Sequence, residues 1–297
     1  MNRKIDVSTK IERANVPELD LILGHAFPVL DQGLVRVIDY MGNDAAIVQM
    51  ARVSYGDGTE TPSDDEQLIR YLMRHAHTSP FEGCEIKLHV KMPIFIARQW
   101  MRHRMANINE YSGRYSVIKN EFYLPPADRL GPQSKTNKQG TSDAGYDDKV
   151  KDFILRVLGA TSSEAFEGYE SLIAKDIDLS RELARIGLPL NTYTEFYWKI
   201  DLHNLFHFLK LRSDPHAQQE IRVYAEAIES IVAKWVPFAY QAWVDYKRDA
   251  QTFSRMEMQV LRTYLTPTDC AHLAQTKMSK REIEEFLRKL EIYEARK

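Results

Sequence analysis

The sequence has few of the features that mark secreted, membrane-bound or polyanion-binding proteins. Its two cysteines, Cys84 and Cys270, lie far apart among 297 residues, which fits neither a disulfide framework nor a paired metal or redox motif. No apolar run approaches the length of a membrane span, and the first 20 residues are too polar for a secretory signal. We therefore expect a cytoplasmic protein that has no membrane partner.

The chain also has almost no excess of charge of one sign, because 40 Lys and Arg residues nearly balance 42 Asp and Glu residues, for a net charge of −2. This balance gives no general attraction to nucleic acid, so an anionic ligand would have to be bound by a local cluster. What is present is an ordinary globular composition, with 44% hydrophobic and 28% charged residues. The chain can therefore bury a sizeable core.

Hydrophobic periodicity predicts many helices and few strands. Residues 35–39 are β-branched and residues 85–91 alternate between apolar and polar, which predicts two strands, the second half-exposed and antiparallel. Asn43 is placed to cap a helix that reaches Arg52. Further helical patterns cover residues 162–175, 178–186 and 201–212. The predicted fold class is α+β, a helix-rich single domain with a small antiparallel sheet, and not a doubly wound sheet.

The chain is predicted to contain one main domain with an extension at each end. Residues 1–33 have turn formers but no sustained period, and we interpret them as an N-terminal extension. Residues 34–247 form the main domain, in which residues 131–148 are rich in turn formers and predict a surface insertion. Residues 248–297 form a C-terminal extension that includes a capped helix beginning near Ser279.

The densest group of polar residues lies between Arg98 and Arg114, where a predicted helix passes into a loop. The guanidinium group of one arginine can donate hydrogen bonds to two phosphate oxygens at once. Several arginines at the end of one helix can therefore bind phosphorylated ligands. Most basic runs are only solvated surface, but Gln99 and Arg102 share a helix face with aromatic and apolar residues. Gly113 also lets the backbone approach a ligand closely.

Within this group, the residues Arg102, His103 and Arg104 are followed by seven residues and then Ser112, a pattern that resembles the signature of flavin-dependent thymidylate synthases. Five further segments resemble blocks of the same family in the same order, namely HTSPFE, FIARQWMRHR, EFYLP, ELARIGLPLN and LRSDPHAQQEI. The resemblance covers about residues 34–245. Several ordered blocks are far less expected by chance than one short motif.

The resemblance implies a homotetramer of α+β subunits whose active sites are shared between subunits. It implies non-covalent FAD, with NADPH and 5,10-methylenetetrahydrofolate as co-substrates and dUMP as the substrate that becomes dTMP. The FAD contacts that it assigns are Ser79, Arg102, His103, Arg104, Glu110, Asp201, Leu202, His203 and His207. The dUMP contacts that it assigns are Gln99, Arg102, Glu110, Tyr111, Ser112, Gly113, Arg114, Arg185 and Arg212.

Arg212 is the residue that we expect to act in catalysis. Its invariably charged guanidinium suits stabilisation of the negative charge that develops on the uracil ring when a hydride arrives. Ser112 has no identifiable base beside it in the sequence, so we expect it to bind the substrate and not to act as a nucleophile.

Two other classes of protein remain as alternatives. The Arg98 to Arg114 cluster, with its tyrosines as stacking platforms, could form an RNA-binding module, but the slightly acidic balance of the chain disfavours that class. His203 and His207 have the spacing of a metal pair in a hydrolase, yet the segment HNLFH lacks the glutamate of an HExxH motif. We therefore expect neither a nucleic acid partner nor a metal.

Overall fold

The structure is a computed structural model that describes residues 13–53, 65–135, 140–142, 144–264, 276 and 278–290. The chain forms two compact units, of which the first ends at Arg248 and the second begins at Asp249. None of the helices in the described ranges is long and apolar enough to cross a membrane.

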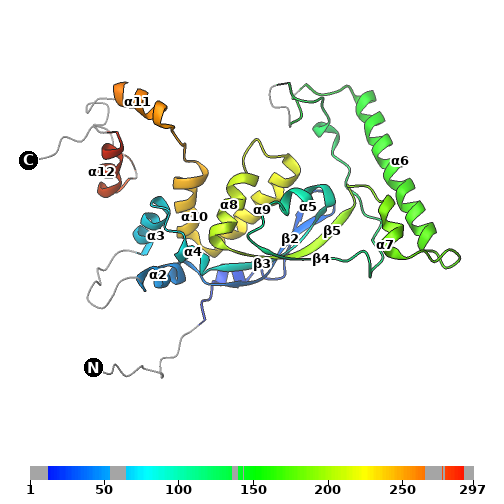
Figure 1. Cartoon of the computed structure of the whole chain (residues 1–297), viewed down its shortest axis with the longest axis horizontal. Helices are drawn as coiled ribbons and strands as arrows, with labels where there is room; N and C mark the ends of the chain where they lie inside the picture. Colours follow the sequence, from blue (N-terminus) through cyan, green and yellow to red (C-terminus); the bar gives the residue numbers. More distant parts are fainter. Residues whose placement is uncertain are drawn as a thin grey trace, which may run out of the picture. The chain divides into compact units, whose positions relative to one another are not determined.

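The first unit contains a five-stranded antiparallel sheet (Figure 1). In spatial order the strands are β1 (Ala26–Val29), β2 (Gly33–Met41), β3 (Glu85–Pro93), β5 (Tyr193–Asp201) and β4 (Asn107–Glu110). The central strands β3 and β5 are paired over their whole length, from Glu85 opposite Asp201 to Pro93 opposite Tyr193. This pairing joins two segments that are a hundred residues or more apart in the chain.

The two faces of the sheet differ because apolar and polar residues alternate along β3 and β5. On one face Leu88 lies opposite Trp198 and Val90 lies opposite Phe196, and these side chains are buried. Helices α5 (Ile94–Trp100), α8 (Leu202–Arg212) and α9 (Gln219–Trp235) cover this face (Figure 1). The opposite face is polar, and there His89 pairs with Glu195 at 3.0 Å.

A second group of helices packs at one end of the sheet. It consists of α2 (Asp44–Arg52), α3 (Asp65–Arg74), α4 (Ser79–Glu82) and α10 (Pro237–Trp243). Helix α10 contacts α2 and α3, while α4 contacts α8. A π-helical turn, η3 (Val244–Arg248), continues α10. These helices bring the segment around residue 78 next to α8.

The long helix α6 (Asp148–Ile173) packs with α7 (Arg181–Ala184) and the 3-10 turn η2 (Arg185–Gly187). Phe166, Tyr169 and Ala184 form the small separate core between these elements. A further 3-10 turn, η1 (Ala127–Arg129), lies before them in the chain. Figure 1 shows α7 beside α6 and apart from α8.

The second unit contains α11 (Arg255–Tyr264) and α12 (Lys280–Lys289). Arg262 donates a hydrogen bond to the carbonyl oxygen of Lys289 at 2.9 Å, which connects the two helices. Ser279 and Glu282 form the capping box at the start of α12, as the sequence predicts.

The structure confirms the helix-rich α+β class, the small antiparallel sheet and the predicted strands, which lie within β2 and β3. Asn43 caps α2 through a 3.0 Å bond from the N–H of Ala46, also as predicted. The expectation that no regular element precedes residue 34 is wrong, because helix α1 (Pro17–Asp20) and β1 lie there. The loop predicted to follow the helix in the Arg98 to Arg114 segment is in part strand β4, and α6 begins 14 residues before the predicted residue 162.

Part of the predicted surface insertion, residues 136–139 and 143, lies outside the described residues, as do parts of both extensions. The homotetramer and the division into residues 1–33, 34–247 and 248–297 stay predictions.

Candidate active site

The end of helix α5 presents the first residues of the arginine motif. Trp100 is fully buried and packs edge-on against Trp198, with ring centroids 5.0 Å apart, so the last turn of α5 is fixed to the sheet. The chain leaves the helix at Met101, and the next residues alternate between exposed and half-buried. Arg102 and Arg104 are exposed, and neither has a hydrogen-bond or carboxylate partner among the residues that the structure describes. Both guanidinium groups are available to an anionic ligand.

Arg212 lies at the end of α8 and reaches the end of α5. Its Nη2 donates a hydrogen bond to the carbonyl oxygen of Gln99 at 3.0 Å, and the side-chain amide of Gln99 in turn donates to Gln218 at 2.5 Å. Burial and the nearby Arg102 guanidinium lower the pKa of Arg212. An arginine stays protonated at neutral pH in any case. Two cations, Arg102 and Arg212, therefore lie where the ends of α5 and α8 meet, and they favour the binding of an anion there.

His103 lies between the motif and α8. Its ring is 5.6 Å from the ring of His207, and its buried Nε2 has no hydrogen-bond partner among the described side chains and backbone. Burial lowers the pKa of His103, and the neighbouring His207 and Arg212 lower it further, against an opposing effect of Asp201. A neutral imidazole with one unused ring nitrogen can bind a polar group of a ligand.

The second half of the motif forms a turn after β4. The carboxylate of Glu110 accepts a hydrogen bond from Thr194 at 2.7 Å, and the N–H of Arg114 donates to the Ser112 hydroxyl at 3.4 Å. A Cβ at Gly113 would lie 3.3 Å from Cδ of Arg185, so the turn and η2 are in close contact at this glycine. The structure therefore brings Arg185, a predicted dUMP contact, beside the turn of the motif.

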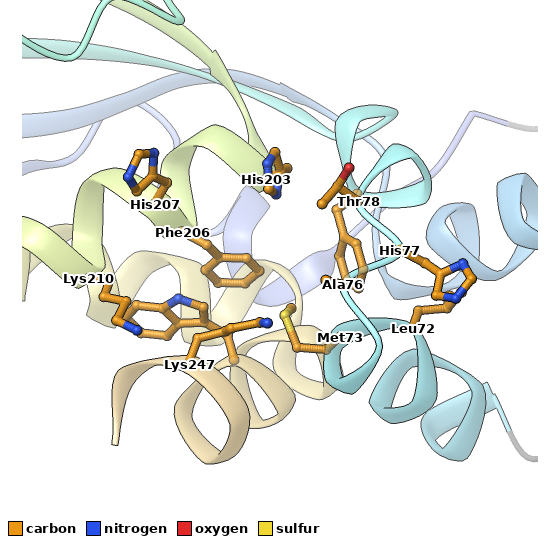
Figure 2. Close-up of a pocket in the computed structure, with 12 residues that line it drawn as sticks. Leu72, Met73, Ala76, His77, Thr78, His203, Phe206, His207, Lys210 and Lys247 are labelled. Carbon is orange, nitrogen blue, oxygen red and sulfur yellow. The ribbon is translucent and has the colours of Figure 1, made fainter. Parts of the chain in front are cut away.

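Beside His203 and His207 is a cavity of about 250 Å³ (Figure 2). Both histidines line it from α8, and Thr78, the neighbour of Ser79, lines it from the start of α4. Its floor is apolar, and Phe206 stacks on Trp243 there at 5.1 Å between ring centroids.

Two of the predicted FAD contacts have structural roles within this chain. The carboxylate of Asp201 caps α8 by accepting hydrogen bonds from the N–H and the side-chain amide of Asn204, at 2.9 and 2.7 Å. The side chain of Leu202 is fully buried, and its N–H donates to the carbonyl oxygen of Cys84 at 2.8 Å. The Leu202 side chain is therefore not exposed to a ligand within this chain.

Nine of the predicted site residues fall into two groups. One group, around the ends of α5 and α8, contains Gln99, Arg102, His103, His207 and Arg212. The other group lies around the turn after β4 and contains Ser112, Gly113, Arg114 and Arg185. Within the described ranges, no three His, Cys, Asp or Glu side chains come together as metal ligands.

Sequence reasoning missed two lysines, Lys210 and Lys247, that line the cavity. Lys210 could have been found, because it lies one helical turn after His207. Lys247 could not, because nothing in the sequence indicates that the end of α10 lies against α8.

Comparison with known proteins identifies the family. Residues 36–238 match the family described as "Thymidylate synthase complementing protein". The chain belongs to this family. A flavin-dependent thymidylate synthase of Wolbachia pipientis is 55% identical over 251 residues, 84% of this chain and 87% of the relative. One from Ehrlichia ruminantium is 51% identical over 276 residues, 93% of this chain and 92% of the relative.

Among solved structures, the UMP/dUMP methylase PolB from Streptomyces cacaoi bound with 5-Br UMP is similar, with a TM-score of 0.66 and 35% identity. The match covers 75% of this chain and 98% of the methylase. Membership of the thymidylate synthase complementing protein family confirms the resemblance seen in the sequence. This membership favours a thymidylate synthase over the two alternatives, an RNA-binding module and a metal-dependent hydrolase.

Proposed function

We propose that the protein is a flavin-dependent thymidylate synthase, which converts dUMP into dTMP. The observation that carries the proposal is the bond from Arg212 to the carbonyl oxygen of Gln99, a residue 113 positions away. This contact joins the arginine motif to the α8 arginine that is expected to activate the pyrimidine. Relatives at 50% identity or more over most of the chain carry this name.

The overall reaction balances with one folate and one nicotinamide cofactor. dUMP, methylenetetrahydrofolate, NADPH and one proton give dTMP, tetrahydrofolate and NADP⁺. The folate supplies the methyl carbon with two of its hydrogen atoms, and the hydride supplies the third. The proton that leaves C5 of the pyrimidine and the added proton complete the two N–H groups of tetrahydrofolate. When FAD is bound, it supplies the hydride transfer between the nicotinamide and the pyrimidine.

The residues of the site fit FAD and dUMP by their chemistry. The exposed Arg102 and Arg104 supply unpaired guanidinium groups for phosphate oxygens. The unpartnered Nε2 of His103 and the imidazoles of His203 and His207 can bond to polar atoms of a flavin. Ser79, Glu110 and the start of α8, at Asp201 and Leu202, complete the proposed FAD contacts.

Arg212 is proposed to stabilise negative charge on the uracil ring. The hydrogen bond to Gln99 fixes the direction of the guanidinium before the substrate arrives, and a fixed cation stabilises developing charge without reorganisation. The phosphate of dUMP is proposed to bind the turn at Ser112 to Arg114, with Arg185 beside it.

We also propose that the active protein is a homotetramer with shared active sites. The segment that carries Arg185 exposes large apolar side chains, including Leu183 at 53%, Ile186 at 75% and Leu190 at 58%. Exposed apolar groups that cluster in this way are typical of a surface that another subunit covers. The cytoplasmic location expected from the sequence stays a prediction.

Flavin binding tests the proposed site. The protein, freed of bound flavin, should take up FAD with a change in its visible absorption spectrum, and Arg104→Gln should weaken the uptake. Arg156→Gln changes an exposed arginine of α6 outside the motif and serves as the matched control. A protein that takes up no FAD, or whose uptake is weakened equally by both substitutions, would contradict the proposed site.

A further inference from the structure

The side chain of Gln218 contacts the candidate site from a third helix. Its Oε1 accepts a hydrogen bond from Nε2 of Gln99 at 2.5 Å, although 119 positions separate the two residues in the chain. The backbone carbonyl oxygen of Gln99 accepts the hydrogen bond from Arg212. Helices α5 and α8 both contact α9, and Gln218 lies at the start of α9 (Figure 1). The three helices therefore meet at Gln99.

Gln218 is an unusual residue for its position in the helix. It is the N-cap residue of α9, a position that favours Ser, Thr, Asp and Asn, because their short side chains accept hydrogen bonds from the first N–H groups of a helix. The side chain of Gln218 makes no such bond. Residues that break a local rule of this kind are expected at functional sites. The contact with Gln99, a predicted dUMP contact, indicates which function Gln218 has.

The loop before Gln218 is stabilised by its own hydrogen bonds. The carboxylate of Asp214 accepts a hydrogen bond from the N–H of His216 at 2.7 Å, and from α9 the side chain of Arg222 donates to the carbonyl oxygen of Pro215 at 3.1 Å. The hydrogen bonds from His216 lower the pKa of Asp214, so this carboxylate stays ionised near neutral pH. The loop therefore presents Gln218 to Gln99 from a fixed position.

The side chain of Gln99 needs support of this kind to bind a ligand well. A glutamine has several rotatable bonds, and fixing them costs conformational entropy. Gln99 is half-buried, and among the residues that the structure describes Gln218 is the hydrogen-bond partner of its side-chain amide. An amide that is held before the ligand arrives loses less entropy on binding, so the affinity rises. Because Gln218 accepts one N–H, Gln99 keeps its carbonyl oxygen and a second N–H for the ligand.

We propose that Gln218 is a positioning residue for dUMP, which acts by holding the side-chain amide of Gln99 in the orientation that binds this substrate. The inference rests on the proposed function, because it takes the substrate from that reaction. Gln218 contacts the side chain of Gln99, whereas Arg212 contacts its backbone. Loss of the Gln218 amide should therefore weaken dUMP binding and leave the charge stabilisation proposed for Arg212 in place. The KM for dUMP should rise while kcat changes little.

The variant Gln218→Ser, with FAD bound, distinguishes this role from support of the helix alone. The serine hydroxyl can cap α9 but is too short to reach Gln99, so the free energy of unfolding should not fall. The KM for dUMP should rise about tenfold, and kcat should stay within about twofold of the unaltered enzyme. The KM for NADPH should not change. A calorimetric titration with dUMP should show the same loss of affinity.

The neighbouring glutamine of α9 provides the matched control. Gln219 is half-buried, and its side chain has no hydrogen-bond partner within the part of the chain that the structure describes. Gln219→Ser makes the same chemical change one position further along and should leave the KM for dUMP unchanged.

A double-mutant cycle tests whether Gln218 acts through Gln99. Gln99→Met removes the amide that Gln218 holds, so adding Gln218→Ser to this variant should have no further effect on dUMP affinity. The inference is overturned if Gln218→Ser leaves the KM for dUMP unchanged, or if it lowers dUMP affinity by the same factor with and without Gln99→Met. It is also overturned if Gln219→Ser has an equal effect. Failure of the proposed function is distinct, because the unaltered protein would then neither bind dUMP nor form dTMP.

Discussion

The guanidinium of Arg212 donates a hydrogen bond from Nη2 to the carbonyl oxygen of Gln99, with 3.0 Å between donor and acceptor. This contact fixes the end of α8 against the end of α5, where the arginine motif begins. A helix end has backbone carbonyls without intrahelical partners, so Arg212 satisfies one of them while its charge stays available. One side chain thus completes a helix and contributes to the candidate site.

Removal of this side chain should affect turnover more than stability. We expect Arg212→Ala to lower kcat for dTMP formation by about 10² to 10³, because a fixed charge at the uracil ring is lost. Arg212→Lys keeps the charge but not the planar group, and should recover little of the loss. Steady-state assays with unchanged far-ultraviolet circular dichroism check this, and activity within threefold of the unaltered enzyme for Arg212→Ala would contradict it.

Ser112 is expected to bind dUMP and not to act as a nucleophile. Ser112→Ala should reduce activity without abolishing it, because the hydroxyl only accepts the N–H of Arg114 in the motif turn. Steady-state kinetics together with a dUMP binding titration distinguish the two roles. Complete loss of turnover with dUMP affinity intact would count against the binding role.

Gly113 is expected to be required because there is no space for a side chain at this position. In Gly113→Ala the new Cβ would lie 2.7 Å from Cδ1 of Ile118 and 3.3 Å from Cδ of Arg185, so both side chains must shift. Overpacking of this kind costs about 1–3 kcal/mol, and we expect dUMP affinity to fall about tenfold.

Two further variants check this explanation by dUMP titration. Adding Ile118→Val removes Cδ1 and should restore part of the affinity. Gly168→Ala has no atom within 4 Å of the new Cβ and should leave dUMP binding unchanged. An equal loss in Gly113→Ala with and without Ile118→Val would show that crowding is not the cause.

His103 should make stability depend on pH. Burial first, and then the neighbouring His207 and Arg212, lower the pKa of His103, so the unfolded chain takes up this proton at a higher pH than the folded protein. Stability therefore falls as pH drops below the usual histidine pKa of about 6.5. His103→Gln removes this contribution and should lose less Tm between about pH 7.5 and pH 5.5.

The exposed His25, replaced by Gln, is the control for this measurement, and it should keep the pH dependence of the unaltered protein. Thermal unfolding followed by circular dichroism at both pH values is sufficient. If His103→Gln loses as much Tm as the control does, the histidine is not the source of the effect.

Ala76 should be a site where glycine stabilises the protein. The N–H of His77 donates to the carbonyl oxygen of Leu72 and the N–H of Ala76 to that of Met73, which is the helix ending that usually has glycine at the left-handed position. Ala76→Gly should raise the free energy of unfolding by about 1 kcal/mol. Ala174→Gly, where φ is −63°, should not stabilise. Urea unfolding measures both changes, and no gain in Ala76→Gly would contradict the prediction.

Local patterns in the sequence were sufficient for many elements of the fold. The alternation at residues 85–91 predicts β3, and Asn43 predicts the start of α2, because both depend on neighbouring residues only. The missed strand β5 also has such a pattern, with buried Phe196, Trp198 and Ile200 alternating with polar residues. Strand β4 is exposed along its whole length and has no pattern of its own, since it depends on pairing with β5.

The candidate site could be predicted only in part for the same reason. The motif and its family resemblance predict Arg102, Ser112 and Arg212 as site residues, but not the contact between Arg212 and Gln99. The pairing of Lys210 with Lys247 depends on how α10 packs, which no local pattern encodes. The capping role of Asp201 likewise appears only in the structure.

The identity of the folate product tests the central claim most directly. The purified protein would be incubated with FAD, NADPH, dUMP and methylenetetrahydrofolate, and the folate that accompanies dTMP would be identified by chromatography. A flavin-dependent synthase leaves the folate unoxidised, so we predict tetrahydrofolate, with no dTMP when FAD is removed. Formation of dihydrofolate, or dTMP formation that needs neither FAD nor NADPH, would contradict the proposed function.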